Sequence, residues 1–205
     1  DQDILQLKSI VNNNDIYILS DEVYEHIIFD GTEHWSMIRE DELYRRSFIV
    51  SSFGKTFHIT GWKVGYCIAP PALTEELRKV HQFLTFSTST PAQYALAEYI
   101  KNHGRVKELK NFYQSKRDYF LNLISDTKFR PLKCEGTYFQ LLDYSEISNE
   151  NDYEFAVRLT KEYRIASIPV SVFYKDRTDN KVLRFCFAKE ESTLTEAAVR
   201  LKSFI

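Results

Sequence analysis

Apolar positions near the start of the chain follow a helical period once and then gather into short continuous runs. Ile4, Leu7 and Val11 fall on one face of a helix, which the asparagines at 12–14 end. Continuous apolar runs bounded by polar turns are typical of strands that are buried on both faces of a sheet. Three such strands are predicted, at residues 16–19, 48–50 and 64–69.

Helical spacing returns after the third predicted strand. Apolar residues share one face of a helix that we expect over residues 74–85. Pro91 begins a further helix that is expected to reach His103, with Gly104 as its C-cap. Gly104 therefore marks the predicted boundary between two domains, residues 1–104 and 105–205.

The second domain alternates helices with strands. Thr193 and Glu196 have the spacing of a capping box at the start of its last helix. The predicted helices cover residues 106–124, 153–163 and 194–204, and the predicted strands cover 137–142, 165–168 and 182–187. This alternation predicts a small α+β domain.

Composition and charge narrow the class of protein. Apolar residues make up 43% of the chain and charged residues 27%, which is ordinary for a soluble globular protein. The net charge is -2, and neither a basic run nor an apolar stretch of membrane-spanning length occurs. We therefore expect no nucleic-acid partner and no membrane partner. The three cysteines lack metal-ligand spacing, which favours reduced thiols and a cytoplasmic location.

Glycine is scarce for a cofactor-binding α/β protein. The chain has 6 Gly, below the typical ~7% of residues, and none precedes Gly31. Phosphate-binding loops at helix N-termini normally contain glycine. The chain also begins at Asp1, and its single methionine is Met37. We therefore expect an N-terminal segment to be missing, with tag removal and chance composition as the alternative.

Polar residues follow two of the predicted strands. The segments at 20–24 and 51–56 bring together acidic, hydroxyl, phenol and amine groups, and ligands of open α/β sheets bind beyond the carboxyl ends of strands. Taken singly, each residue has a structural alternative, because Asp commonly caps turns and Lys in a loop is commonly solvated.

Two other kinds of site fit the sequence poorly. The tripeptide at 54–56, Gly-Lys-Thr, ends like a Walker A loop, but the glycine that this loop needs five positions earlier is Ile49. The five histidines have no metal-binding spacing, so no metal site is expected.

Longer strings resemble one family. Ser-Asp-Glu-Val-Tyr-Glu-His at 20–26 is similar to a strand-end motif of class I/II, fold-type-I aminotransferases. Residues 52–66, Ser-Phe-Gly-Lys-Thr-Phe-His-Ile-Thr-Gly-Trp-Lys-Val-Gly-Tyr, resemble the lysine motif of that family, and the strand containing Arg184 resembles its arginine strand. Within the family, the segments at 63–65, 81–93 and 134–139 resemble the branch of kynurenine aminotransferase, glutamine transaminase K and bacterial methionine aminotransferase.

The resemblance implies a site for pyridoxal 5′-phosphate. Lys55 would form the covalent link to the cofactor and, when released, act as the catalytic base. Asp21 would pair with the ring nitrogen and Tyr24 with the phenolic oxygen, while Ser52 and Lys63 would hold the phosphate. Many relatives have arginine where Lys63 stands, and lysine keeps the charge without the bidentate geometry.

Two further residues would bind substrate. Arg184 would hold the substrate carboxylate, and its structural alternative is an ordinary ion pair at a sheet edge. Phe86 would line the substrate pocket of a neighbouring subunit, and its alternative is plain core packing.

The resemblance also implies the fold and the activity. The fold would be the C-terminal part of a large α/β domain with a mostly parallel sheet, followed by a small α+β domain. The complete protein would be a homodimer that exchanges amino groups between an amino acid of the methionine, glutamine or aromatic type and a 2-oxo acid. The alternatives are a carbon–sulfur β-lyase with the same cofactor, a fragment that is inactive alone, and a non-enzymatic binding domain.

Overall fold

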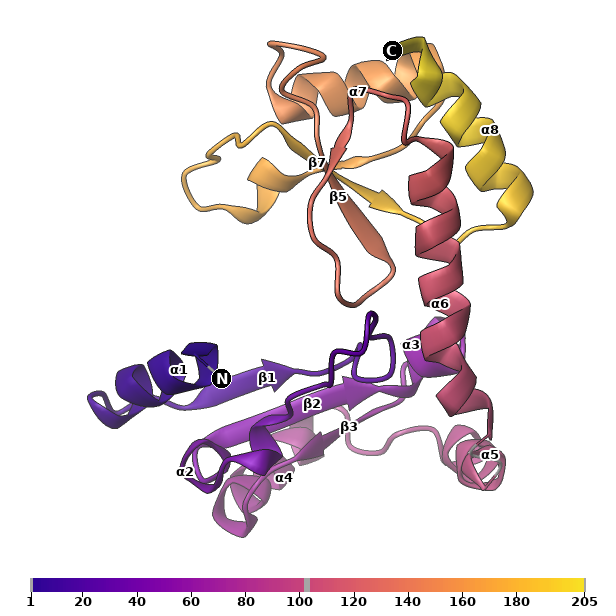
Figure 1. The fold of residues 1–205 in the computed structure, drawn as a ribbon. Coiled ribbons are helices and arrows are strands. Elements are labelled where there is room, and N and C mark those ends of the chain that lie inside the picture. The colour runs from indigo at the N-terminus through magenta and orange to yellow at the C-terminus, as the bar shows by residue number, and fades with distance from the viewer. Residues whose placement is uncertain (1, 102–103, 205) are drawn as a thin grey trace. The chain divides into compact units, whose positions relative to one another are not determined.

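The chain divides into two compact units. The computed structural model describes residues 2–101 and 104–204 (Figure 1). The first unit comprises Asp1–His26 with Glu33–Glu108, and the second comprises Ile27–Thr32 with Leu109–Ile205. A domain boundary at residue 104 stays a prediction for the whole protein.

The first unit is a three-stranded sheet with helices. Its strands are β1 (Ile18–Asp21), β2 (Ser47–Ser52) and β3 (Gly65–Ile68). Its α-helices are α1 (Gln2–Asn12), α2 (Asp41–Tyr44), α3 (Phe53–Thr56), α4 (Pro71–Leu84) and α5 (Thr90–Ile100). The described residues also form the 3-10 helices η1 (Met37–Arg39) and η2 (Thr60–Trp62). The helix α6 (Gly104–Leu123) begins in the first unit and continues into the second.

The strand order is β1-β2-β3, with β1 parallel and β3 antiparallel to β2. A core forms on one face, where Val11, Met37, Leu43 and Ile49 are buried together. Val11 comes from α1 and Leu43 from α2, so these two helices cover the face of β2 that carries Ile49.

The apolar run at 16–19 predicts that β1 is buried on both faces, and this prediction is wrong for this chain. The strand begins at Ile18, later than expected, and Leu19 is 72% exposed. The reason is that α1 and α2 cover only one face, and Leu19 points to the other. The apolar face of α4 is open too, since Val80 is 54% and Leu84 is 81% exposed.

The second unit packs helices on a four-stranded antiparallel sheet. Its strands are β4 (Arg130–Pro131), β5 (Phe139–Asp143), β6 (Ile168–Pro169) and β7 (Val182–Cys186). The strand order is β4-β5-β7-β6. The other elements are α7 (Asp152–Tyr163), η3 (Val170–Phe173), α8 (Glu191–Leu201) and η4 (Lys202–Phe204).

Aromatic contacts mark the core of the second unit. The ring of Phe185 in β7 lies 6.4 Å from that of Phe120 in α6 and 6.0 Å from that of Phe129. Phe129 in turn contacts Phe155 of α7 at 6.3 Å. The face of the sheet that carries Phe185 is therefore the face that the helices cover.

Several boundaries differ from those predicted. Helix α8 begins at Glu191, before Thr193, and its N-cap is Glu190, so the capping box is wrong. The extended backbone of Glu190 and the hydrogen bond from Leu194 N–H to its carbonyl start the first turn earlier than the motif suggests. Gly104 opens α6, whereas α5 ends at Ile100, so Gly104 is not a C-cap of α5. His103 lies outside the described residues.

The segment Ile27–Thr32 joins the second unit although its sequence neighbours belong to the first. Phe29 is fully buried, and its N–H donates to the carbonyl of Glu135 at 2.9 Å. The guanidinium of Arg117 donates to both carboxylate oxygens of Asp30, at 2.6 and 2.8 Å. These bonds join residues 87 positions apart, so no local pattern predicts them.

Candidate active site

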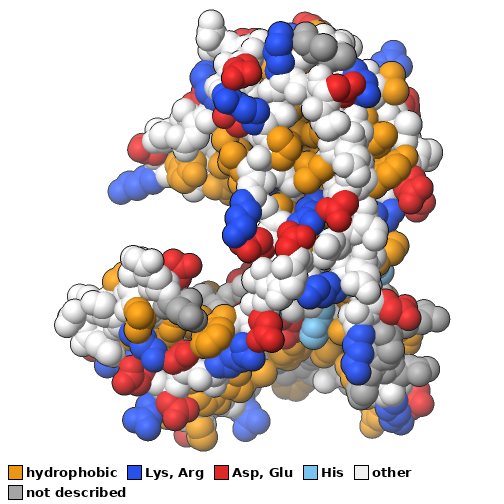
Figure 2. Space-filling view, viewed as in Figure 1, with side chains coloured by type: hydrophobic (Ala, Val, Ile, Leu, Met, Phe, Trp, Pro, Cys, Tyr) orange, Lys and Arg blue, Asp and Glu red, His pale blue; other side chains and the backbone are white. Residues whose placement is uncertain are grey.

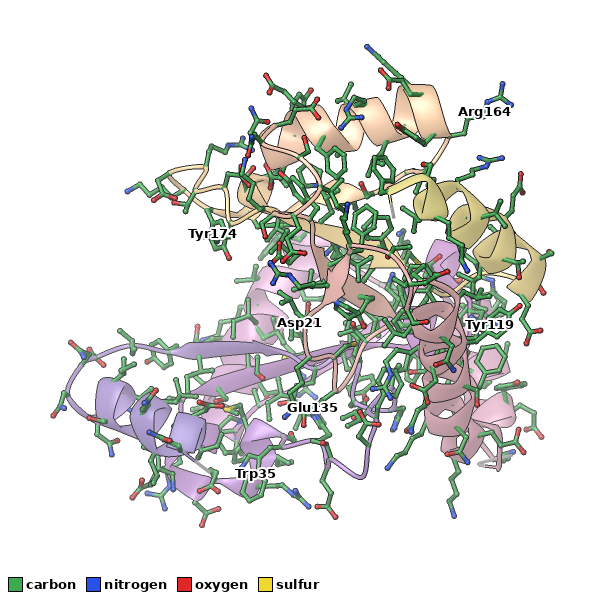
Figure 3. All side chains as sticks on the ribbon, turned by 45° about the horizontal axis from the view of Figure 1, so that its top comes forward. Asp21, Trp35, Tyr119, Glu135, Arg164 and Tyr174 are labelled. Carbon is green, nitrogen blue, oxygen red and sulfur yellow. The ribbon has the colours of Figure 1, made fainter. Side chains whose placement is uncertain are left out.

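Two predicted site residues lie where β1 and β2 end, at the same end of the sheet. Asp21 is the last residue of β1 and Ser52 is the last residue of β2. The two strands are parallel, and the N–H of Glu22 continues their ladder by donating to the carbonyl of Val50 at 2.8 Å. The side chains of Asp21, which is labelled in Figure 3, and Ser52 therefore leave the sheet at the same end.

Strand alternation also places these two residues on the same face. Paired residues of neighbouring strands share a face, and successive residues alternate. Asp21 pairs with Val50, two residues before Ser52, so Asp21 and Ser52 lie on one face. By the same rule Ser51 and its partner Tyr66 in β3 lie on the opposite face.

Lys55 is the third residue of the short helix α3. Ser52 is the N-cap of this helix, and its Oγ accepts a hydrogen bond from the N–H of Gly54 at 3.0 Å. A Cβ at Gly54 would lie 3.1 Å from both Ser52 Oγ and Thr60 Cα, which favours glycine there. The capped turn holds Lys55, whose side chain is half-buried, close to the end of β2.

Lys63 lies at the other end of the same segment, just before β3. The N–H of Phe53 donates to the carbonyl of Val64 at 3.2 Å, so Lys63 is brought back towards Ser52. Lys63 is exposed and has a φ of 54°, in the left-handed region. Non-glycine residues in that region are uncommon and often belong to functional sites.

A buried carboxylate supports the strand end. Glu22 is 6% exposed and accepts hydrogen bonds from Ser20 Oγ and the N–H of Met37, each at 3.0 Å. His34 Nε2 lies 2.8 Å from its other oxygen. Burial raises the pKa of Glu22, but the hydrogen bonds, led by that with His34, outweigh burial and lower the pKa below its ordinary value. The ionised Glu22 thus fixes the turn that follows Asp21.

A second carboxylate, Glu25, accepts hydrogen bonds from Ser51 and Tyr66. Sequence reasoning assigned a role to Asp21 and missed both Glu22 and Glu25, although all three lie in the motif at 20–26. The signal that could have found Glu22 is strand alternation, because the residue after Asp21 points away from the face of Asp21.

Tyr24 and Phe86 complete the predicted set in the first unit. Tyr24 is half-buried in the turn after β1. Phe86 follows α4 with a φ of 62° and is 83% exposed, so its interpretation as plain core packing is wrong for this chain. A role in the pocket of a neighbouring subunit stays a prediction.

Arg184 belongs to the second unit and lies in β7, an inner strand of the sheet. Its side chain projects from the face opposite Phe185, away from the helical core. The guanidinium carbon lies 4.2 Å from the ring centroid of Phe139 and 5.0 Å from that of Phe173. Among the described residues Arg184 has no ion pair, and its buried Nε has no hydrogen-bond partner. The interpretation as an ion pair at a sheet edge is therefore wrong.

Metal clusters and membrane-spanning helices are both absent from residues 2–101 and 104–204. No group of three or more His, Cys, Asp or Glu side chains in these ranges is placed to hold a metal ion. No helix in them combines the length and the apolar character needed to cross a bilayer.

Known proteins share both the sequence and the fold. The chain is 48% identical over 201 residues to methionine aminotransferase of Escherichia coli strain K12, covering 98% of the chain and 52% of that protein. It is 37% identical over 202 residues to kynurenine–oxoglutarate transaminase of Dictyostelium discoideum, covering 88% and 46%. The chain thus spans about half the length of the curated relatives it matches.

Two solved structures superpose closely. Escherichia coli YbdL, identified as having a methionine aminotransferase function, matches with a TM-score of 0.94 and 48% identity over 98% of this chain and 54% of its own. N-succinyldiaminopimelate aminotransferase from Mycobacterium tuberculosis matches with a TM-score of 0.90 and 30% identity over 97% and 52%. Both are aminotransferases, which confirms the predicted fold class of a fold-type-I aminotransferase.

The match to the family is equally extensive. The family model described as aminotransferase class I and II covers residues 1–201. It therefore includes the strand ends that carry Asp21 and Ser52, the helix that carries Lys55, and the strand that carries Arg184. The chain belongs to the class I and II aminotransferase family.

Proposed function

We propose that the whole protein is a pyridoxal-phosphate-dependent aminotransferase acting on an amino acid of the methionine, glutamine or aromatic type and a 2-oxo acid. The observation that carries this proposal is that Asp21, Ser52 and Lys55 lie at one end of the β1–β2 pair. The hydrogen bond from Phe53 to Val64 brings the chain next to Lys63 back to the same end. The 48% identity to a methionine aminotransferase supports methionine as one of these amino acids.

The residues at this end of the sheet fit the cofactor. Pyridoxal phosphate supplies the electron-accepting ring that carries the amino group between the two substrates. The Oγ of Ser52 already accepts a bond from Gly54 N–H, so its own proton remains to donate to a phosphate oxygen. Lys63, exposed at the other end of the segment, would add a positive charge to the phosphate.

Three residues would carry the proton chemistry. The ε-amine of Lys55 would remove the α-proton of the substrate and return a proton during the reverse half-reaction. The carboxylate of Asp21 would keep the ring nitrogen protonated through its fixed negative charge. The phenol of Tyr24 would donate to the phenolic oxygen of the cofactor.

Arg184 would bind the substrate carboxylate. Its Nε is buried and unpartnered, and a carboxylate accepts such a donor in the planar geometry of a guanidinium group. The rings of Phe139 and Phe173 would hold the guanidinium plane in place.

Assembly and location belong to the same proposal. We expect a homodimer in the cytoplasm, with Phe86 lining the substrate pocket of the neighbouring subunit. The 83% exposure of Phe86 supports this role, because an aromatic side chain so open to solvent suits a contact with a neighbouring subunit.

The first prediction tests the covalent link. Borohydride reduction of the whole protein loaded with pyridoxal phosphate, followed by peptide mapping, should recover the label on Lys55. Lys55→Arg should give no label and no transamination, because the arginine guanidinium neither forms the link nor accepts the proton. Recovery of the label on another lysine, such as Lys63, would contradict the assignment.

The same preparation separates transamination from β-lyase chemistry. Methionine with a 2-oxo acid should give the oxo acid of methionine and the amino acid of the acceptor. Release of pyruvate from cystathionine without an acceptor, at a rate above that of transamination, would identify a β-lyase instead.

A further inference from the structure

Glu25 joins the ends of all three strands in the first unit. One oxygen, Oε1, accepts hydrogen bonds from Ser51 Oγ at 3.1 Å and from Tyr66 OH at 2.5 Å. Glu25 itself follows β1, and its N–H turns back to the carbonyl of Glu22 at 3.0 Å. Ser51 belongs to β2 and Tyr66 to β3, so a single carboxylate ties these strands at one end of the sheet.

Its two partners flank the segment that carries the proposed cofactor residues. Ser51 comes directly before Ser52, and Tyr66 comes directly after Gly65, the partner of Ser52 in the sheet. The segment 52–65 between them includes Lys55 and Lys63. Glu25 therefore bonds to the residues at both ends of this segment, on the face of the sheet opposite Ser52.

Both partners of Glu25 keep a proton to donate near neutral pH. Burial and then the hydrogen bond to Glu25 raise the pKa of Tyr66 to about 12, so its phenol stays protonated and donates. The hydroxyl of Ser51, which is 8% exposed, is a permanent donor. Hydrogen bonds to an ionised acceptor are shorter and stronger than those between neutral groups.

Tyr66, which is held by Glu25, packs against the segment 52–65. The ring of Tyr66 lies 5.2 Å from that of Phe53, the first residue of α3. A Cβ at Gly65 would lie 2.6 Å from the carbonyl oxygen of Ser51, which shows how closely β3 approaches β2. A shift of Ser51 or Tyr66 would therefore move both the cap of α3 and the residues before β3.

We propose that Glu25 is a positioning residue that fixes Ser52 and Lys63 relative to each other for binding the phosphate of the cofactor. This inference rests on the proposed function. Glu25 itself would touch neither the cofactor nor the substrate, because its partners lie on the face opposite Ser52.

The test compares two ligands that differ only in the phosphate. The apo form of the whole protein is titrated with pyridoxal phosphate and with pyridoxal, and thermal unfolding is recorded without ligand. Glu25→Ala should weaken pyridoxal phosphate binding by roughly tenfold, with pyridoxal binding changed by less than about threefold. Glu25→Gln should keep the ratio of the two affinities near that of the parent, because its amide oxygen still accepts both bonds. Glu76→Ala, which removes an exposed glutamate of α4, is the matched control and should change neither affinity.

Each outcome decides the matter. Equal weakening of both ligands by Glu25→Ala would show a general structural role and overturn the proposal. If Glu25→Ala does not fold, Tyr66→Phe removes one donor and leaves the carboxylate in place. An unchanged affinity ratio in Tyr66→Phe would also overturn the proposal. A parent protein that binds neither ligand would refute the proposed function instead.

Discussion

Single residues near the ends of β1 and β2 combine a structural bond with a proposed chemical role. Ser52 caps α3 through its oxygen and keeps its proton free to donate. Asp21 uses one oxygen, Oδ1, to accept the N–H of Val23 at 3.1 Å. Each side chain is thus held by the fold before any ligand arrives, which reduces the entropy lost on binding.

The second prediction concerns Asp21. In Asp21→Asn the amide oxygen can still accept the N–H of Val23, so the turn and the thermal stability should be retained. The fixed negative charge is lost, however, and α-proton exchange should slow by at least about a hundredfold, since each ~1.4 kcal/mol of lost transition-state stabilisation is tenfold in rate. Exchange of the α-proton of methionine in deuterated water measures this step. A rate within a few-fold of the parent would refute the role of Asp21.

The third prediction concerns the backbone of Lys63. A left-handed conformation costs a non-glycine residue roughly 1–2 kcal/mol, and glycine adopts it freely. Lys63→Gly should therefore leave the melting temperature unchanged or raised, while removal of the ammonium group weakens pyridoxal phosphate binding by about tenfold or more. Calorimetry of the apo form and cofactor titration measure the two effects separately. Parent-like affinity would remove Lys63 from the phosphate site.

At the scale of elements, β3 approaches the backbone of β2 too closely at Gly65 to leave room for a side chain. Because its hypothetical Cβ would lie 2.6 Å from a backbone oxygen, no flexible side chain is available to move aside. The packing of these two strands thus depends on one position without a side chain.

The fourth prediction follows from that contact. Gly65→Ala should destabilise the whole protein by roughly 1–3 kcal/mol, the usual range for overpacking. Gly61→Ala is the matched control, because no atom lies within 4 Å of a Cβ built there. Its effect should stay within about 0.5 kcal/mol. Urea unfolding of both variants provides the measurement, and equal stabilities would contradict the packing argument.

At the scale of the whole molecule, the described residues leave much apolar surface open. Leu19, Phe83, Leu84 and Phe86 are each more than 70% exposed, at 72%, 84%, 81% and 83%. Figure 2 shows hydrophobic side chains on the surface of the molecule. The N–H groups of Ile18 and Glu22 point to β2, so the N–H of Leu19 faces the other edge of β1, where no strand of the described residues lies. An open strand edge beside exposed apolar residues favours self-association.

The fifth prediction is that residues 1–205 alone will associate and will not transaminate. Light scattering after size exclusion measures the mass, and a titration with pyridoxal phosphate, methionine and a 2-oxo acid measures turnover. Leu19→Lys should reduce the association, because an edge charge opposes strand pairing, without restoring activity. Steady turnover by a monodisperse 205-residue species would refute the prediction.

The sequence by itself determined the family, the order of the motifs and most elements. Helical period located α1, α6 and α7, and apolar runs located β2, β3 and β7, because these patterns are local to each element. The strings at 20–26 and 52–66 identified the family, and the extensive match of sequence and structure confirms it.

Only the tertiary structure decided the contacts between distant residues. The bonds of Glu25 span 26 and 41 positions, and they depend on the register of three strands. The hydrogen bond from Phe29 to Glu135 within the second unit and the aromatic neighbours of Arg184 are of the same kind. The physical reason is that periodicity specifies which face of an element is apolar, whereas the partner of that face is set by how the elements pack.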